Sequence, residues 1–128
     1  MSRQDRPNVL VIMTDQQKAT ASHLYGNTFC QTPYMERLAQ EGVLFEHAIT
    51  PHPLCAPARV SFWTSQFPHS HGARRNQTLM PSDATHAFKI WKEADYQIGL
   101  IGKKTLHFGF GCVVAGGHAS YWLTRNAT

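Results

Sequence analysis

The sequence lacks any long hydrophobic run. Its first apolar stretch, residues 9–13, is short, Asp15 follows closely, and no small-residue cleavage site comes after it. A secretory signal needs a longer apolar core, and a membrane-spanning helix needs about 20 apolar residues. We therefore expect neither a leader peptide nor a membrane anchor, and we predict a cytoplasmic protein without a membrane partner.

Cysteine and clustered charge are also scarce. The three cysteines, Cys30, Cys55 and Cys112, form no tight pairing pattern, which argues against a disulfide framework. The formal net charge of +4 is mild, and Arg74–Arg75 is the densest basic pair. Nucleic-acid binders usually carry a clustered basic stripe, so we predict no nucleic-acid partner. An anionic small substrate remains compatible with this charge.

The order of apolar and helical patterns predicts an α/β domain. We expect strands at 7–14, 43–50 and 96–102, and helices at 33–41, from about 57, and at about 85–94. The first strand is a continuous apolar run, which is typical of a strand buried on both faces of a parallel sheet. We therefore predict a mainly parallel sheet flanked by helices. Residues 110–128 show no clear periodicity.

Candidate functional residues follow the predicted strands, where open α/β sheets place their ligands. Asp15 follows the first strand and could ligate a metal, or it could cap a helix or loop. Lys103, Lys104 and His107 follow the third predicted strand and could supply cations and a proton donor. Each of them could equally be an ordinary solvated residue at a strand end.

The segment C-A-P-A-R, residues 55–59, is the third candidate. Pro57 can start a helix, which places Cys55 at or just before the helix N-terminus, where the dipole and free N–H groups favour an anion. Arg59 lies one turn along and could hold a tetrahedral oxyanion in a bidentate grip. The alternative is a buried structural cysteine with Arg59 on a solvated face.

Taken together, the run from Pro7 to Gly109 resembles the N-terminal part of the type I sulfatases, within the alkaline phosphatase superfamily. RPNVLVIMTDQQ resembles the opening strand and metal-binding segment of that family, and TPYMERLAQEGVLFEHAIT its next helix and strand. CAPAR matches the C-x-P-x-R core of the sulfatase signature. IWKEADYQIGLIGK resembles the segment written K-x-x-G-Y-x-x-x-x-x-G-K.

This resemblance implies an alkaline phosphatase-like α/β fold and hydrolysis of sulfuric esters. Residues 1–109 would be the N-terminal part of the catalytic domain, and residues 110–128 a divergent tail. Cys55 would be oxidised to formylglycine by a separate formylglycine-generating enzyme. One hydroxyl of the aldehyde hydrate would attack the ester, and elimination from the other hydroxyl would then restore the aldehyde.

The resemblance also implies roles for further residues. Arg59, Lys103 and His107 would assist catalysis. Asp15, Gln16 and the modified Cys55 would bind a divalent cation, Ca²⁺ or Mn²⁺, which would lower the pKa of the hydrate and neutralise ester oxygens. The substrate would be a small-molecule sulfate or phosphonate ester.

Two departures and the length of the chain keep alternatives open. Gln16 stands where a second acidic residue is common, and Thr105 stands where a histidine usually follows Lys103. Both features resemble phosphonate monoester hydrolases, so a phosphonate or phosphate ester hydrolase of the same superfamily is one alternative. Family members are several times longer and carry their second pair of metal ligands downstream, so a catalytically inactive truncated product is another.

Overall fold

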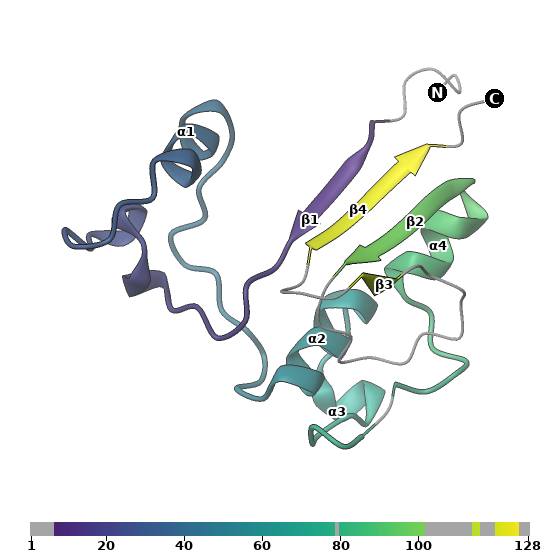
Figure 1. The fold of residues 1–128 in the computed structure, drawn as a ribbon. Helices are drawn as coiled ribbons and strands as arrows, with labels where there is room; N and C mark the ends of the chain where they lie inside the picture. Colours follow the sequence, from purple (N-terminus) through teal and green to yellow (C-terminus); the bar gives the residue numbers. More distant parts are fainter. Residues whose placement is uncertain (1–6, 79, 102–113, 116–119, 126–128) are drawn as a thin grey trace. The chain divides into compact units, whose positions relative to one another are not determined.

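The computed structural model describes residues 7–78, 80–101, 114–115 and 120–125. The chain divides into two compact units (Figure 1). The larger unit comprises Met1–Asp15 and Thr50–Thr128, and the smaller unit is Gln16–Ile49. Each is described by itself below.

A four-stranded sheet organises the larger unit. Its strands are β1 (Val9–Ile12), β2 (Tyr96–Ile101), β3 (Val114–Ala115) and β4 (Ser120–Arg125), in the spatial order β1-β4-β2-β3. β4 lies between β1 and β2 and runs antiparallel to both, while β2 and β3 are parallel (Figure 1). The prediction of an α/β architecture is confirmed, but a mainly parallel sheet is wrong for the described strand pairs.

The antiparallel central strand determines where the carboxyl ends of β1 and β2 lie. Because β1 and β2 are both antiparallel to β4, they point the same way, and their carboxyl ends lie at the same edge of the sheet. Leu10 and Gly99 are both register partners of Trp122. Asp15, shortly after β1, therefore leaves the sheet at the edge that open α/β folds use for ligands.

Helices α2 (Cys55–Thr64), α3 (Pro68–His71) and α4 (Ala87–Glu93) accompany this sheet. Val11 and Met13 pack against the buried core, whereas Leu10 and Ile12 are 62% and 65% exposed. The expectation that the first strand is buried on both faces is therefore wrong for the described residues. Alternation in burial is what a strand shows when only one face of its sheet is covered.

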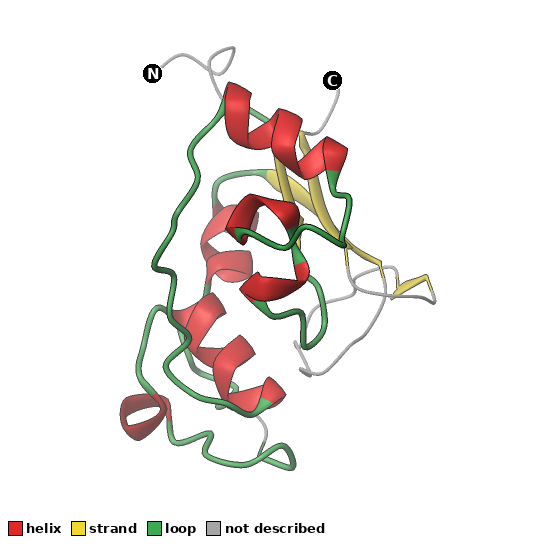
Figure 2. Ribbon diagram, turned by 90° about the vertical axis from the view of Figure 1, so that its left-hand side faces the viewer, coloured by secondary structure: helices red, strands yellow, loops and turns green. Residues whose placement is uncertain are grey.

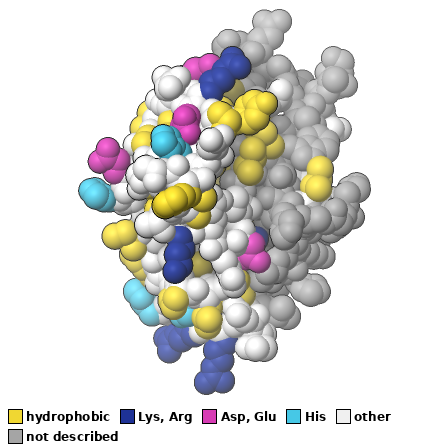
Figure 3. All heavy atoms as spheres, turned by 60° about the vertical axis from the view of Figure 1, so that its left-hand side comes forward, with side chains coloured by type: hydrophobic (Ala, Val, Ile, Leu, Met, Phe, Trp, Pro, Cys, Tyr) yellow, Lys and Arg dark blue, Asp and Glu magenta, His cyan; other side chains and the backbone are white. Residues whose placement is uncertain are grey.

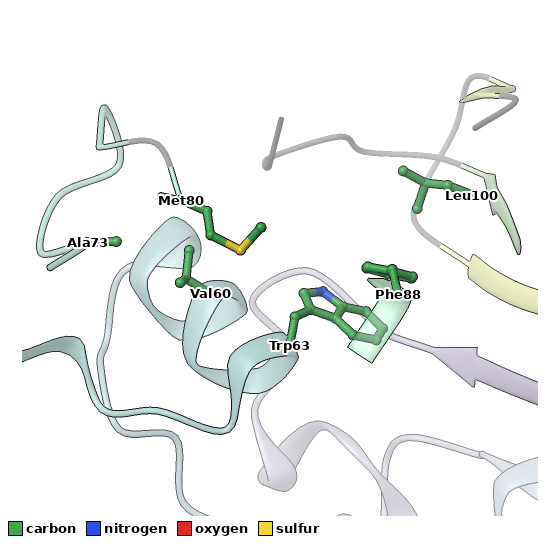
Figure 4. Close-up of a cluster of buried hydrophobic side chains, with 6 residues drawn as sticks. All are labelled: Val60, Trp63, Ala73, Met80, Phe88 and Leu100. Carbon is green, nitrogen blue, oxygen red and sulfur yellow. The ribbon is translucent and has the colours of Figure 1, made fainter. Parts of the chain in front are cut away.

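The core of the larger unit centres on Trp63 of α2 (Figure 4). Its ring centroid lies 4.3 Å from that of Phe88 and 6.1 Å from that of Trp91, both from α4. The buried cluster consists of Val60, Trp63, Ala73, Met80, Phe88 and Leu100. Large aromatic side chains bury much apolar area, so these rings make a substantial hydrophobic contact between α2 and α4.

The predicted helices of this unit form close to their expected bounds. α2 begins at Cys55 rather than at Pro57, and α4 spans most of the predicted 85–94 helix. Asp95, just beyond α4, has a φ of 68°, the left-handed conformation that Asp tolerates better than most residues. Ser65 adopts the same conformation at the C-cap of α2, with a φ of 55°.

The smaller unit holds two short 3₁₀ helices, η2 (Ala19–Ala21) and η3 (His23–Tyr25), and helix α1 (Pro33–Glu41) (Figure 2). Pro33 occupies the first turn of α1 after Thr32, as predicted. Thr32 does not cap the helix with its side chain, because its Oγ1 instead accepts the backbone N–H of His23 at 3.2 Å. Polar contacts of this kind hold the loop before the helix.

Residues 43–50 do not form the predicted strand. Val43, Phe45 and Ile49 are 78%, 71% and 90% exposed, and hydrophobic side chains remain visible on the face shown in Figure 3. An apolar alternation favours a strand only where another strand pairs with it, and local sequence does not encode that partner.

Among the described helices, none is both long and apolar enough to cross a bilayer.

Candidate active site

Asp15, Cys55 and Arg59 form one cluster in the larger unit. The Sγ of Cys55 lies 3.8 Å from Oδ1 of Asp15, and a terminal guanidinium nitrogen of Arg59 lies 3.5 Å from the same oxygen. The three residues come from the segment after β1 and from the first turns of α2, 40 and 44 positions apart in sequence. The structure thus brings together three of the residues that the sequence singled out.

Helix α2 presents Cys55 at its first position. Leu54 is the N-cap in an extended conformation, and its carbonyl accepts the N–H of Ala58 at 3.1 Å, which closes the first helical turn. The N-cap offers no side-chain acceptor to the first N–H groups of the helix. Free N–H groups and the helix dipole create a positive potential at this end, which favours a bound anion in front of the helix.

Arg59 is a buried cation beside a partly exposed carboxylate. Its side chain is 6% exposed, and that of Asp15 is 27% exposed. Removing a guanidinium from water is costly unless a carboxylate compensates, and Asp15 supplies one. The charge of Arg59 is therefore held in place one turn inside the helix, behind Cys55.

Asn76 belongs to the site although its only local signal in the sequence is an N-x-T sequon. Its Oδ1 accepts the backbone N–H of Ala56 at 3.1 Å. This bond satisfies one of the free donors of α2 from a residue 20 positions away, directly beside Cys55. No local pattern announces a capping residue that far along the chain, so only the tertiary structure reveals it.

His71 supports the same helix from the other end. Its Nδ1 accepts the backbone N–H of Ala73 at 3.1 Å, so the remaining ring nitrogen, Nε2, carries the proton of the neutral ring and donates to Ser61 Oγ at 2.9 Å. Burial of the ring, aided by the nearby His52 and His69, lowers the pKa of His71 below the ordinary histidine value of 6.5. The neutral histidine thus links α2 to the loop after α3 through two hydrogen bonds.

The remaining predicted site residues are Gln16, Lys103 and His107. Lys103 and His107 lie outside the described residues. Gln16 falls in the smaller unit and has a φ of 55°, which places its backbone in the left-handed region. Their predicted roles stay predictions.

The donors in the larger unit fit part of a metal site. Two oxygen ligands bound side by side to Ca²⁺ lie on the order of 3–3.5 Å apart, close to the 3.8 Å between Asp15 Oδ1 and Cys55 Sγ. An oxygen at position 55 and the Asp15 carboxylate could therefore share a cation. Within the described ranges, no group of three or more His, Cys, Asp or Glu side chains converges on one point.

A family model matches nearly the whole chain. The sulfatase model matches residues 7–126, which include Asp15, Cys55 and Arg59. The chain belongs to the sulfatase family. The match also covers β4, so the family's pattern continues into the stretch after residue 109.

Sulfatases from distant organisms are similar to this family member. An N-acetylglucosamine-6-O-sulfatase of Bacteroides thetaiotaomicron is 35% identical over 77% of the chain and 18% of its own length. Rat steryl-sulfatase is 36% identical over 85% of the chain and 20% of its own length. Human arylsulfatase H is 30% identical over 98% of the chain and 24% of its own length.

The chain thus spans about a fifth of the length of the curated relatives it matches. No solved structure gives a significant match.

Proposed function

We propose that the chain carries the nucleophile segment of a sulfuric ester hydrolase, with formylglycine at position 55. The observation that carries the proposal is the single cluster of Cys55, Asp15 and Arg59 at the start of α2. Its support comes from family membership and from similarity to proteins named as sulfatases. We propose an alkaline phosphatase-like fold for the complete catalytic domain.

Each side chain of the cluster has a role that follows from its position. The hydrate of formylglycine would supply an oxygen nucleophile that displaces the alcohol of the ester. Deprotonation of its second hydroxyl would then re-form the aldehyde as the bond from carbon to the sulfated oxygen breaks and sulfate leaves. Arg59, buried and held by Asp15, fixes the orientation of the group at position 55 and offers a positive charge to the sulfuryl oxygens. Asn76 holds the first turn of α2, so the N–H groups there stay aimed at the site.

The divalent cation in this proposal is Ca²⁺ or Mn²⁺. Asp15 and the oxygen at position 55 would hold it from the larger unit, and Gln16 would add an amide oxygen. The cation supplies Lewis-acid stabilisation of negative charge when it is bound. Asp15 serves both the cation and Arg59, so it couples the charge of the metal site to the orientation of the nucleophile.

Gln16 favours a second candidate, hydrolysis of phosphonate or phosphate esters. An amide in place of a carboxylate leaves more positive charge on the bound cation. A phosphonate monoester near neutral pH carries one negative charge, as a sulfate monoester does, so the same cluster could hold either. A phosphate monoester carries close to two negative charges, and the extra positive charge on the cation suits it better. Lys103 and His107 would supply positive charge and a proton in both cases.

Co-expression with a formylglycine-generating enzyme tests the proposal. The peptide containing Cys55 should lose about 18 Da, as expected when a thiol is replaced by a carbonyl oxygen, and should react with aldehyde probes. Cys30 is a matched internal control, because it is also a half-buried free thiol but lacks the C-x-P-x-R pattern. An unmodified Cys55, or equal modification of Cys30, would refute the assignment.

A further inference from the structure

We propose that His52 is a positioning residue for the group at position 55, acting through the peptide unit that leads into α2. The inference rests on the proposed function, because it assigns a support to that same nucleophile from outside the C-x-P-x-R segment. The role of His52 is to hold the backbone from which the reacting atoms project.

The hydrogen bond of His52 lies immediately before α2. Its Nδ1 accepts the backbone N–H of Leu54 at 3.1 Å. Short polar side chains such as Asn and Asp form the same kind of turn when they accept the N–H two residues further along the chain. A ring nitrogen accepts only when it carries no proton, so the proton of the neutral ring is on Nε2. The imidazole thus acts as a side-chain acceptor for the N-cap residue of the helix.

Three consecutive peptide units around Cys55 are each held by one hydrogen bond. The bonds run from Leu54 N–H to His52 Nδ1, from Ala58 N–H to the Leu54 carbonyl, and from Ala56 N–H to Asn76 Oδ1. A peptide unit is planar, so the direction of a Cα–Cβ bond is set by the planes on its two sides. His52 holds the first plane, which fixes the extended N-cap, with a φ of −87° and a ψ of 144°, from which the helix starts.

The loop before the helix is restricted by its prolines as well. Pro51 and Pro53 flank His52. A proline ring fixes φ, and the residue before a proline is confined mostly to extended conformations. Neither proline has an N–H to donate, so side chains make the bonds here, and the hydroxyl of Thr50 donates to the carbonyl of His52 at 3.2 Å. The bond from Leu54 to His52 is the last link of this restrained segment before Cys55.

The direction of the side chain at position 55 matters because its neighbour comes from another element. Sγ of Cys55 lies 3.8 Å from Oδ1 of Asp15, which follows β1 rather than α2. A displacement of about 1 Å at a reacting group can change a rate by about a hundredfold. A bond that fixes the start of α2 therefore contributes to the site through geometry, although the residue that makes it belongs to a loop.

The variants His52→Ala and His52→Asn separate the hydrogen bond from the ring. Ala removes the acceptor, whereas Asn offers its Oδ1 to the N–H of Leu54. The unmodified, ¹⁵N-labelled chain is followed by NMR. We expect a backbone order parameter at Cys55 of about 0.85 in the unaltered chain and in His52→Asn, and below about 0.6 in His52→Ala. The N–H of Leu54 should exchange about fivefold faster in His52→Ala and regain the unaltered rate in His52→Asn.

His23→Ala is the matched control. It removes another hydrogen bond between an imidazole Nδ1 and the backbone, that with the carbonyl of Asn27 in the smaller unit, and should leave the values at Leu54 and Cys55 unchanged. An unchanged order parameter at Cys55 in His52→Ala, or a failure of His52→Asn to restore it, would overturn the inference. So would an equal loss of order throughout the larger unit, because His52 would then support the whole unit rather than position one residue.

The experiment separates this inference from the proposed function. If Cys55 is converted to formylglycine but its order does not depend on His52, the positioning role alone fails. If the order depends on His52 but Cys55 is not converted, His52 still holds the start of α2, and the assignment of the reaction fails.

Discussion

Replacing His71 by Asn tests how helix α2 is held in place. In the structure, Nδ1 of His71 accepts the N–H of Ala73 at 3.1 Å. The Oδ1 of Asn can take the position of this nitrogen and still accept that N–H. The shorter side chain has nothing at the position of Nε2, so it removes the 2.9 Å hydrogen bond to Ser61. The substitution therefore deletes one named contact between α3 and α2.

The expected loss follows from burial. Ser61 and His71 are both 5% exposed, so water does not replace the missing partner. Leaving a buried polar group without a partner costs about 1–3 kcal/mol of the free energy of unfolding. We expect His71→Asn to lose about 2–3 kcal/mol, including the small void left by the ring. Ser61→Ala should lose about 1–2 kcal/mol, because it leaves the Nε2–H donor unpaired.

Urea unfolding followed by tryptophan fluorescence is a suitable assay, because Trp63, Trp91 and Trp122 all belong to the larger unit. The double variant, which removes both partners, should be less destabilised than the sum of the single variants by about 1 kcal/mol or more. If the two losses add within about 0.3 kcal/mol, the bond between Ser61 and His71 contributes nothing and the reasoning is refuted.

Four further predictions use other features of the structure. Burial lowers the pKa values of His71 and His86, so the unfolded chain binds more protons than the folded chain between the folded pKa values and 6.5. The unfolding free energy measured across pH should therefore be highest above 6.5 and should decrease as pH falls through the folded pKa values. A flat profile would contradict the buried neutral rings. Ser65→Gly should raise the unfolding free energy by about 0.5–1 kcal/mol in urea titrations, because Ser65 holds a left-handed φ of 55°; a loss would show that the serine side chain stabilises the cap. Phe88→Ala should cost about 3–4 kcal/mol and Phe62→Ala less than about 1 kcal/mol, since they are 4% and 53% exposed; equal costs would contradict the core assignment. Even with formylglycine installed and Ca²⁺ or Mn²⁺ added, the 128-residue chain should show no measurable hydrolysis of aryl sulfates or aryl phosphonates, because hard cations need six or more oxygen ligands; metal-dependent turnover that Asp15→Ala abolishes would show the site to be complete.

Local signals predicted the helices and the start of α2 well. Thr32-Pro33 and Pro57 are helix-start signals, Asp95 adopts a left-handed conformation just after α4, and Cys55 lies at a helix N-terminus. These features depend on residues only a few positions apart, so the sequence displays them directly. The contact of Asp15 with Cys55 followed from the rule that ligands gather at strand ends, together with the family resemblance.

The errors all involve partners that are distant in sequence. Whether residues 43–50 pair as a strand depends on a neighbour that their own pattern does not specify. β4 was missed although its segment SYWLTR is rich in residues that favour strands, because an aperiodic setting obscured it. Asn76 and His71 were missed as supports of α2 because their bonds to Ala56 and Ser61 join residues 20 and 10 positions apart.

The position of β4 in the sheet also determines when the site can assemble. β1 ends at Ile12 and β2 begins at Tyr96, and the strand that bridges them begins only at Ser120. Both ladders of β4 must form before β1 is aligned with β2, and the contact of β1 with β4 closes a loop of more than 100 residues. Such closure is slow and comes late in folding, since its entropic cost precedes any compensating contact. On a ribosome, α2 with Cys55 can form before β4 has been synthesised, so until then the cysteine segment can be a helix end without its carboxylate.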